Sequence, residues 1–136
     1  MQDQTVITFT DYSRLMALLE LVSLKSKLPE PASHLYNELL KSRTVRQENI
    51  PANVVTMNSH LSVKDLNEEK EYDLTITYPQ NASHHQKYVS VFAPTGVAVL
   101  GRCVGDIVSF KTPEGYKYLE ITNIIYQPEA SGDYSA

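Results

Sequence analysis

Four histidines are the residues of this chain best suited to bind a metal ion, and two of them, His84 and His85, are adjacent. Zinc sites in proteins take several nitrogen, sulfur or oxygen ligands, and no cysteine or further histidine stands at ligand spacing from this pair. His34 and His60 stand alone in the sequence. We therefore predict that His84-His85 belongs to a solvated loop and that the chain holds no metal.

Cys103 is the only cysteine of the chain. A reactive thiol needs a base or a positive environment, and no histidine is placed by the sequence to activate this one. We predict that Cys103 is a small buried hydrophobe, and a single cysteine also fits a reducing cytoplasm. Because the chain has no Gly-rich phosphate loop of the Walker or dinucleotide type, we predict no catalytic residue and no cofactor.

Composition restricts the class of protein. The 136 residues suffice for one ordinary domain, or for a small domain with an appendage. A net charge of −4 at pH 7 argues against tight sequence-independent binding of nucleic acid, which requires a basic surface. The most apolar early stretch, residues 15–24, is too short to span a membrane and lacks the pattern of a signal peptide. We expect a cytoplasmic monomer with no membrane contact and no direct sequence-specific binding of nucleic acid.

Two amphipathic segments near the start predict a short helical hairpin. Thr8 and Thr10 are alternative N-caps of the first helix. Its apolar side follows the spacing i, i+3, i+4, i+7 and consists of Leu15, Leu18, Leu19 and Val22. Prolines within residues 25–31 break this helix, and the second helix is predicted over residues 32–42, with Leu35, Tyr36, Leu39 and Leu40 on its apolar side. An antiparallel hairpin (coiled coil) with an arm of only about 20 Å should lean on the domain that follows.

The rest of the chain predicts a sheet with one short helix. Residues 72–78 alternate apolar and polar side chains most clearly, and further strands are expected at 54–56, 61–63, 88–91, 107–110 and 118–126. Pro94 suits the first position of a helix that Gly101 ends. Residues 112–115 predict a hairpin turn, and the tail 127–136 is expected to be loose. The prediction is an α+β chain with a hairpin and linker in residues 1–48 and an antiparallel sheet domain in residues 49–136.

At this point the motifs resemble those of a known family. The order of a helical hairpin, a linker and a sheet domain is combined with Val-Ser-Val-x-x-Pro at 89–94, Leu-Gly at 100–101, Val-Gly-Asp at 104–106 and Thr-Pro-x-Gly at 112–115. This combination resembles the bacterial Gre transcript-cleavage factors. Two nine-residue segments, 51–59 and 126–134, resemble a short-armed member of the same family.

The resemblance implies an FKBP-like fold for the second domain and binding to RNA polymerase at the rim of its secondary channel, with the hairpin pointing inward. In Gre factors the docking loop carries Asp-Ser-x-Pro-like chemistry. The corresponding residues here are Phe92 and Ala93, followed by Pro94 and, one turn later, Val97. Ala93 cannot cap the helix through its side chain, which forfeits about 1 kcal/mol. Phe92 serves either as an apolar docking surface or as part of the core, and both interpretations stay open.

The resemblance also implies that cleavage needs acidic residues at the hairpin tip, which help to hold Mg²⁺ in the polymerase active site. The tip here offers Glu30 alone, near Lys25 and Lys27, and one carboxylate beside two ammonium groups is a poor partner for Mg²⁺. We therefore predict a non-enzymatic transcription regulator that binds RNA polymerase and competes with Gre factors. The alternatives are an authentic Gre-type cleavage factor and an FKBP-like peptide-binding module.

Overall fold

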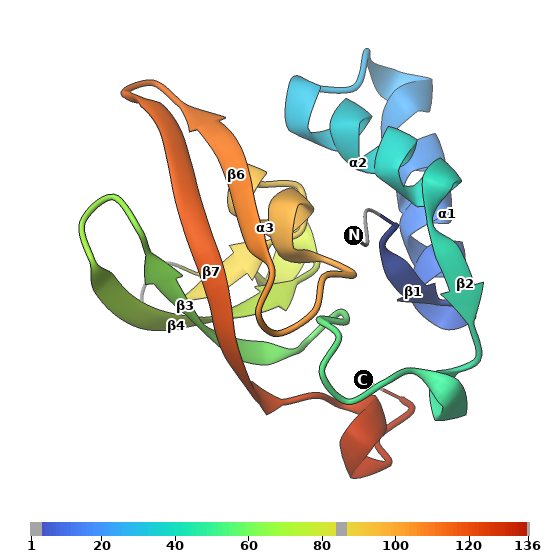
Figure 1. The fold of residues 1–136 in the computed structure, drawn as a ribbon. Helices are drawn as coiled ribbons and strands as arrows, with labels where there is room; N and C mark the ends of the chain where they lie inside the picture. Colours follow the sequence, from blue (N-terminus) through green and yellow to red (C-terminus); the bar gives the residue numbers. More distant parts are fainter. Residues whose placement is uncertain (1–3, 84–86, 136) are drawn as a thin grey trace.

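The structure is a computed structural model that describes residues 4–83 and 87–135 (Figure 1). Helices and a small sheet come first and a larger curled sheet follows. The helices are α1 (Phe9–Lys25), α2 (Glu30–Lys41) and α3 (Pro94–Val99), with 3-10 turns η1 (Gln47–Asn49), η2 (Pro79–Asn81) and η3 (Glu129–Ser131). The strands are β1 (Val6–Thr8), β2 (Arg43–Val45), β3 (His60–Asp65), β4 (Lys70–Thr77), β5 (Tyr88–Ser90), β6 (Ile107–Thr112) and β7 (Gly115–Tyr126).

The two long helices lie side by side and form the arm of the molecule (Figure 1). Thr8 is the N-cap of α1, since its side-chain oxygen accepts a hydrogen bond from the backbone N–H of Asp11 at 3.0 Å. The second helix begins at Glu30, two residues before the predicted start, because proline is tolerated in the first turn and Pro31 sits there. The finer prediction of an antiparallel coiled coil stays a prediction.

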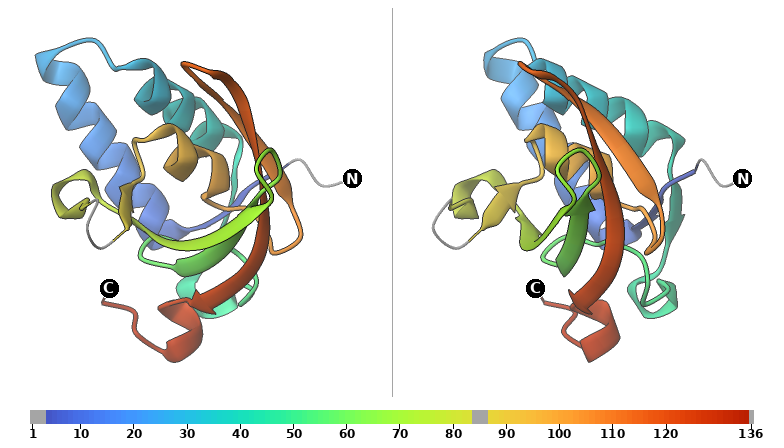
Figure 2. Two further views of the ribbon diagram at one scale, coloured as in Figure 1. Left: turned by 90° about the vertical axis from the view of Figure 1, so that its left-hand side faces the viewer. Right: turned by 60° about the vertical axis from the view of Figure 1, so that its left-hand side comes forward.

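The larger sheet has the strand order β5-β4-β3-β7-β6 and curls around α3 (Figure 2). The prediction of an antiparallel sheet is wrong at one edge, where β5 pairs parallel with β4, so the sheet is mixed. The strand predicted at 54–56 is also wrong, because this segment contributes only an isolated bridge between Val54 and Cys103. A second small sheet, in which β1 pairs parallel with β2, was not predicted.

One hydrophobic core joins the arm to the larger sheet. Leu15 and Leu19 of α1 and Leu35 and Leu39 of α2 belong to the same cluster of buried side chains as the inner residues of the sheet, Leu61, Val63, Leu74, Ile76, Leu119 and Ile121. The arm therefore leans on the domain that follows it, with α2 packed against α3, as expected for so short a hairpin. The apolar side of α2 differs from the prediction, since Tyr36 and Leu40 are exposed and Ala32 is buried instead.

The C-terminal segment is anchored where the sequence predicts a loose tail. Gln127 is buried, and its side-chain amide donates hydrogen bonds to the carbonyl oxygens of Pro51 at 2.8 Å and Val54 at 2.7 Å. Glu129 is also buried and accepts a hydrogen bond from the hydroxyl of Thr56 at 2.8 Å. The segments 51–59 and 126–134, whose patterns stood out in the sequence, thus bind each other. The error arises because the anchors are polar side chains without a periodic pattern.

Asp11 ties the start of α1 to the same loop. Its carboxylate accepts a hydrogen bond from the backbone N–H of Met57 at 3.1 Å, and the side chain is only 4% exposed. Burial raises the pKa of Asp11 to about 6, the Met57 N–H opposes this rise, the nearby Glu129 adds to it and Arg14 lowers it. A carboxyl group that gains its proton near pH 6 therefore lies at the junction of arm and sheet.

This junction should make stability depend on pH. The pKa of Asp11 in the folded chain lies above 3.8, the ordinary value for an aspartate side chain, so the folded state binds the proton more tightly. Stability from this group is present at low pH and is lost as pH rises through about 6, by on the order of 2 kcal/mol. Asp11→Asn should abolish this decline in urea unfolding measured from pH 4.5 to 7.5. The control Asp133→Asn alters an exposed carboxyl group; an unchanged slope in Asp11→Asn would contradict the assignment.

Candidate functional site

The loop that leads into α3 is held by short hydrogen bonds from the end of β5. The backbone N–H of Phe92 donates to the Ser90 hydroxyl at 3.0 Å, and that of Ala93 donates to the Ser90 carbonyl at 2.9 Å. Pro94 is the first residue of α3, as predicted, and its N-cap Ala93 makes no side-chain hydrogen bond. The loop is thus fixed by the hydroxyl and carbonyl groups of Ser90 rather than by a side chain at the N-cap. We call residues 90–94 the α3 entry loop.

The predicted docking residues differ in how much surface they offer. Pro94 is exposed, while Phe92 and Ala93 are partly exposed. Phe92 packs against the core cluster and keeps part of its surface, so it contributes to the core, and its role in docking stays a prediction. Val97 is only 8% exposed, and its side chain serves mainly to pack α3. The exposed part of the entry loop is therefore apolar, in contrast to the Asp-Ser pair that the resemblance implies for Gre factors.

The fold brings the arm to the entry loop. Glu30 of α2 lines a groove of about 360 Å³ together with Pro94 and Val97. The remaining predicted tip residue, Lys27, is exposed in the loop between the two helices and does not line this groove. Glu30 is the first residue of α2, so the tip carboxylate sits beside α3. The sequence alone does not indicate that Glu30 lies near Pro94, because these residues are brought together only by the packing of the shared core.

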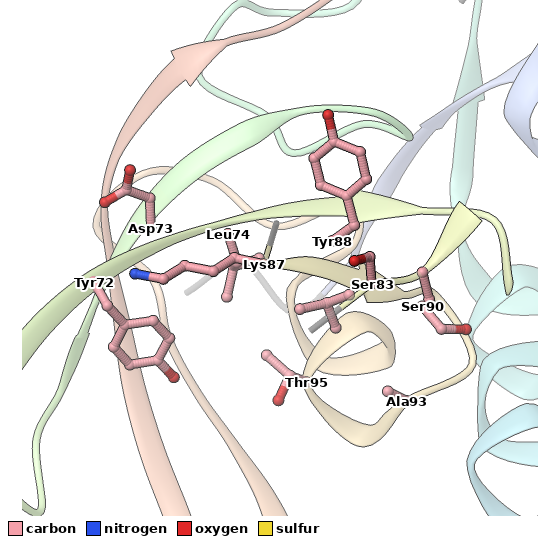
Figure 3. Close-up of a pocket in the computed structure, with 11 residues that line it drawn as sticks. Tyr72, Asp73, Leu74, Ser83, Lys87, Tyr88, Ser90, Ala93 and Thr95 are labelled. Atoms are coloured by element: carbon pink, nitrogen blue, oxygen red, sulfur yellow. The ribbon is translucent and has the colours of Figure 1, made fainter. Parts of the chain in front are cut away.

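A second hollow lies on the other side of the entry loop (Figure 3). It has a volume of about 640 Å³ and is formed by β4, β5 and the start of α3, with Tyr72, Leu74, Ala93 and Thr95 among its lining residues. Burial raises the pKa of Tyr72, an effect that the Lys117 charge opposes. Sequence analysis missed this hollow. The alternation of 72–78 places Tyr72 and Leu74 on one face, but nothing in it indicates that α3 lies opposite.

Of the four histidines considered as metal ligands, His34 and His60 lie in the described part of the chain. His84 and His85 lie outside the described residues, and among the described ones no cluster of three or more His, Cys, Asp or Glu side chains is placed to hold a metal. His60 is not alone, since its Nε2 lies 3.1 Å from Oδ2 of Asp73. His34 likewise has Glu38 at 3.9 Å.

Cys103 is half-buried rather than fully buried. Burial raises the pKa of its thiol, Asp106 raises it further, and the neighbouring Arg102 lowers it. Such a thiol is a poor nucleophile at neutral pH.

No helix in the described ranges is both long and apolar enough to cross a membrane.

Comparison with known proteins identifies the family. Residues 50–126 match the family described as "Transcription elongation factor, GreA/GreB, C-term". This match covers more than half of the chain and includes the entry loop, α3 and all five strands of the larger sheet. The chain belongs to the GreA/GreB family, and it is a Gre-like transcription regulator.

Two relatives and one solved structure show how similar the chain is to individual proteins. The chain is 38% identical over 104 residues to the "Regulator of nucleoside diphosphate kinase" of Escherichia coli (strain K12), covering 76% of each chain. It is 30% identical over 121 residues to "Transcription elongation factor GreA" of Clostridioides difficile (strain 630), covering 89% of this chain and 76% of that one. A solved GreA/GreB structure from Nitrosomonas europaea superposes with a TM-score of 0.74 at 31% identity, covering 92% of this chain and all of the other.

Proposed function

We propose that this chain is a non-enzymatic regulator that binds RNA polymerase at the rim of the secondary channel and competes there with Gre factors. In this proposal residues 49–136 form an FKBP-like docking domain and residues 1–48 an arm that points into the channel. Family membership supports the choice of partner. The exposed Pro94 and partly exposed Phe92 of the entry loop supply an apolar docking surface.

The claim that the chain does not cleave RNA depends on one observation: the arm is short, and its end carries only one carboxylate that could bind a metal ion. The first helix has 17 residues, which at 1.5 Å per residue gives an arm of about 25 Å. The last residue of α1 is Lys25 and the loop after it carries Lys27, while Glu30 lies in the first turn of α2 and lines the groove beside α3. A lone carboxylate in this setting cannot supply the paired oxygen ligands that a catalytic Mg²⁺ would need.

A transcript-cleavage assay on backtracked elongation complexes tests the proposal. With this chain and Mg²⁺ alone, no RNA shortening above the intrinsic rate of the polymerase is expected. With a Gre factor present, increasing amounts of this chain should reduce stimulated cleavage at least about tenfold at saturation, as expected for two ligands of one site. Cleavage by this chain alone would overturn the non-enzymatic assignment, and undiminished Gre-stimulated cleavage would overturn the shared site.

Phe92→Ala tests the docking surface within the same assay. The variant should compete less well, because it removes apolar surface next to Pro94 while leaving the backbone of the entry loop intact. Phe9→Ala is the matched control, since Phe9 is 53% exposed on α1 and lies outside the entry loop. Equal competition by both variants, at equal folded fraction in circular dichroism, would exclude Phe92 from docking.

A further inference from the structure

Two carboxyl groups from opposite ends of the chain hold one loop between them. Oδ2 of Asp11, in the first turn of α1, accepts a hydrogen bond from the N–H of Met57 at 3.1 Å. Oε1 of Glu129, in η3, accepts one from the hydroxyl of Thr56 at 2.8 Å. Because Thr56 and Met57 are adjacent residues, the loop that precedes β3 ties the start of the arm to the C-terminal segment.

Both carboxyl groups are enclosed by the folded chain. Asp11 is 4% exposed and Glu129 is 9% exposed, and Thr56, the partner of Glu129, is 2% exposed. The hydroxyl of Ser59 lies 2.9 Å from that of Thr56 and also accepts the N–H of Thr56 at 2.9 Å. These groups form a buried polar cluster, in which an ionised carboxylate is costly unless a cation or several donors offset its charge.

The charges that face this cluster do not offset two carboxylates. The charged groups that act on Asp11 in the described part of the chain are Glu129 of η3 and Arg14 of α1. Tyr78, which follows β4, is close enough to interact with all three, and residues 54–59 contribute donors but no charge. Burial raises the pKa of Asp11 to about 6, and the charge of Glu129 adds to this rise. Two ionised carboxylates therefore repel each other beside one opposite charge.

The C-terminal segment is the part of this arrangement that can leave without unfolding the sheet. Residues 130–135 are exposed, and the buried part of the segment is limited to residues 127–129. The helix α1, in contrast, is fixed by Leu15 and Leu19 in the shared core. Segments with few buried apolar contacts open locally at a lower cost than global unfolding. Opening of η3 carries the charge of Glu129 away and admits water to Asp11.

From this geometry we propose that Asp11 and Glu129 form a proton-operated latch between the arm and the C-terminal segment. The latch is closed while the pair holds one proton, because a single negative charge then lies in the buried cluster. Loss of this proton increases the population of a local open state, in which η3 has left residues 54–59. Rising pH favours this state because the solvated carboxyl group of Asp11 binds its proton more weakly than the buried one. The latch needs no partner and does not depend on docking to polymerase.

Hydrogen exchange of the full chain, followed by NMR from pH 4.5 to 7.5 and corrected for intrinsic amide exchange rates, tests the latch. The reporters are the N–H groups of Thr56 and Met57, and the reference is the N–H of Ile121 in β7. Opening at the reporters should become at least about tenfold more frequent over this range, because Asp11 titrates at about 6 when closed and near 3.8 when solvated. Urea below the unfolding transition should accelerate exchange at Ile121 but not at the reporters, since local opening exposes little surface.

Two variants separate the roles of the carboxyl groups. Asp11→Asn keeps an oxygen for the Met57 N–H, and its reporters should stay at their low-pH protection throughout. Glu129→Gln should lower the pH at which the Asp11 carboxyl carbon titrates, whereas Glu114→Gln, at an exposed position, should not. An unchanged Asp11 midpoint in Glu129→Gln would overturn the pairing of the two groups.

The unmodified chain decides the matter even where a variant fails to fold. Reporters without pH dependence would overturn the latch, because opening would then leave Asp11 buried. Reporters that follow Ile121 in urea would also overturn it, since the cluster would open only when the whole chain unfolds. Exchange at the reporters that depends on pH and is insensitive to urea is the result that the latch requires.

Discussion

Replacing Gln127 by alanine should lower the free energy of unfolding by about 3 kcal/mol, since it leaves the buried carbonyl group of Val54 without this donor and the N–H of Ala130 without its acceptor. The Gln127 amide is bound to the carbonyl oxygens of Pro51 and Val54, and its own oxygen accepts a hydrogen bond from the N–H of Ala130 at 3.1 Å. One side chain thus holds the loop after the linker to the end of β7. Urea unfolding followed by circular dichroism measures the loss.

Gln47→Ala provides the matched control for this prediction. Gln47 also donates to a distant backbone carbonyl, that of Tyr134 at 3.2 Å, but this contact is exposed and water can replace it. Its loss should therefore cost less than about 0.5 kcal/mol. If the two variants lost the same stability, burial of the Gln127 contacts would not be what anchors the C-terminal segment.

The elements that sequence analysis located correctly are those with a local cause. Thr8 begins α1 because its side chain caps the helix, and Pro94 begins α3 because a helix tolerates proline at its first position. Gly101, with a φ of +79°, follows α3 as the residue that a left-handed helix end requires. The alternation of residues 72–78 marks β4 without help from the rest of the chain.

What the sequence could not predict depends on tertiary partners. Alternation of apolar and polar residues predicts a strand, but it does not predict whether the neighbouring strand runs parallel or antiparallel to it. The three residues of β5 pair parallel with β4. The spacing of α2 allows two overlapping apolar faces, and packing against α1 and α3 buries Leu35 and Leu39 while Tyr36 stays exposed. Gln127 looks like a tail residue until the loop that it binds is in place.

The candidate site likewise has one part that the sequence predicts and one part that it does not. The entry loop was found from its motif, because Pro94 and the residues before it form a local unit. The groove was not, since it is assembled from α2, α3 and β6, which meet only in the folded chain. The position of the entry loop depends in turn on how α3 is held against β5, and this contact leaves no room for a side chain at Gly96.

Gly96→Ala should separate α3 from β5 and cost about 3 kcal/mol of stability, as overpacking against a rigid neighbour does. A Cβ at this position would overlap the Ser90 carbonyl oxygen and lie 2.8 Å from Cα of Val91. Both are backbone atoms that no rotamer change can move, so the better helix propensity of alanine, worth about 1 kcal/mol, does not compensate. The thermal midpoint of unfolding should fall accordingly.

The same displacement should weaken competition with Gre factors in the cleavage assay, because the carbonyl that holds the N–H of Ala93 is the one that the new methyl group displaces. Thr95→Ala, at the adjacent position of α3, is the control that should leave stability within about 1 kcal/mol of the original chain. If Gly96→Ala were destabilised yet competed as well as Thr95→Ala at equal folded concentration, the position of α3 would be irrelevant to docking. If Gly96→Ala kept its stability but no longer competed with Gre factors, the entry loop itself would be implicated in binding the partner, since α3 and β5 together hold this loop in place.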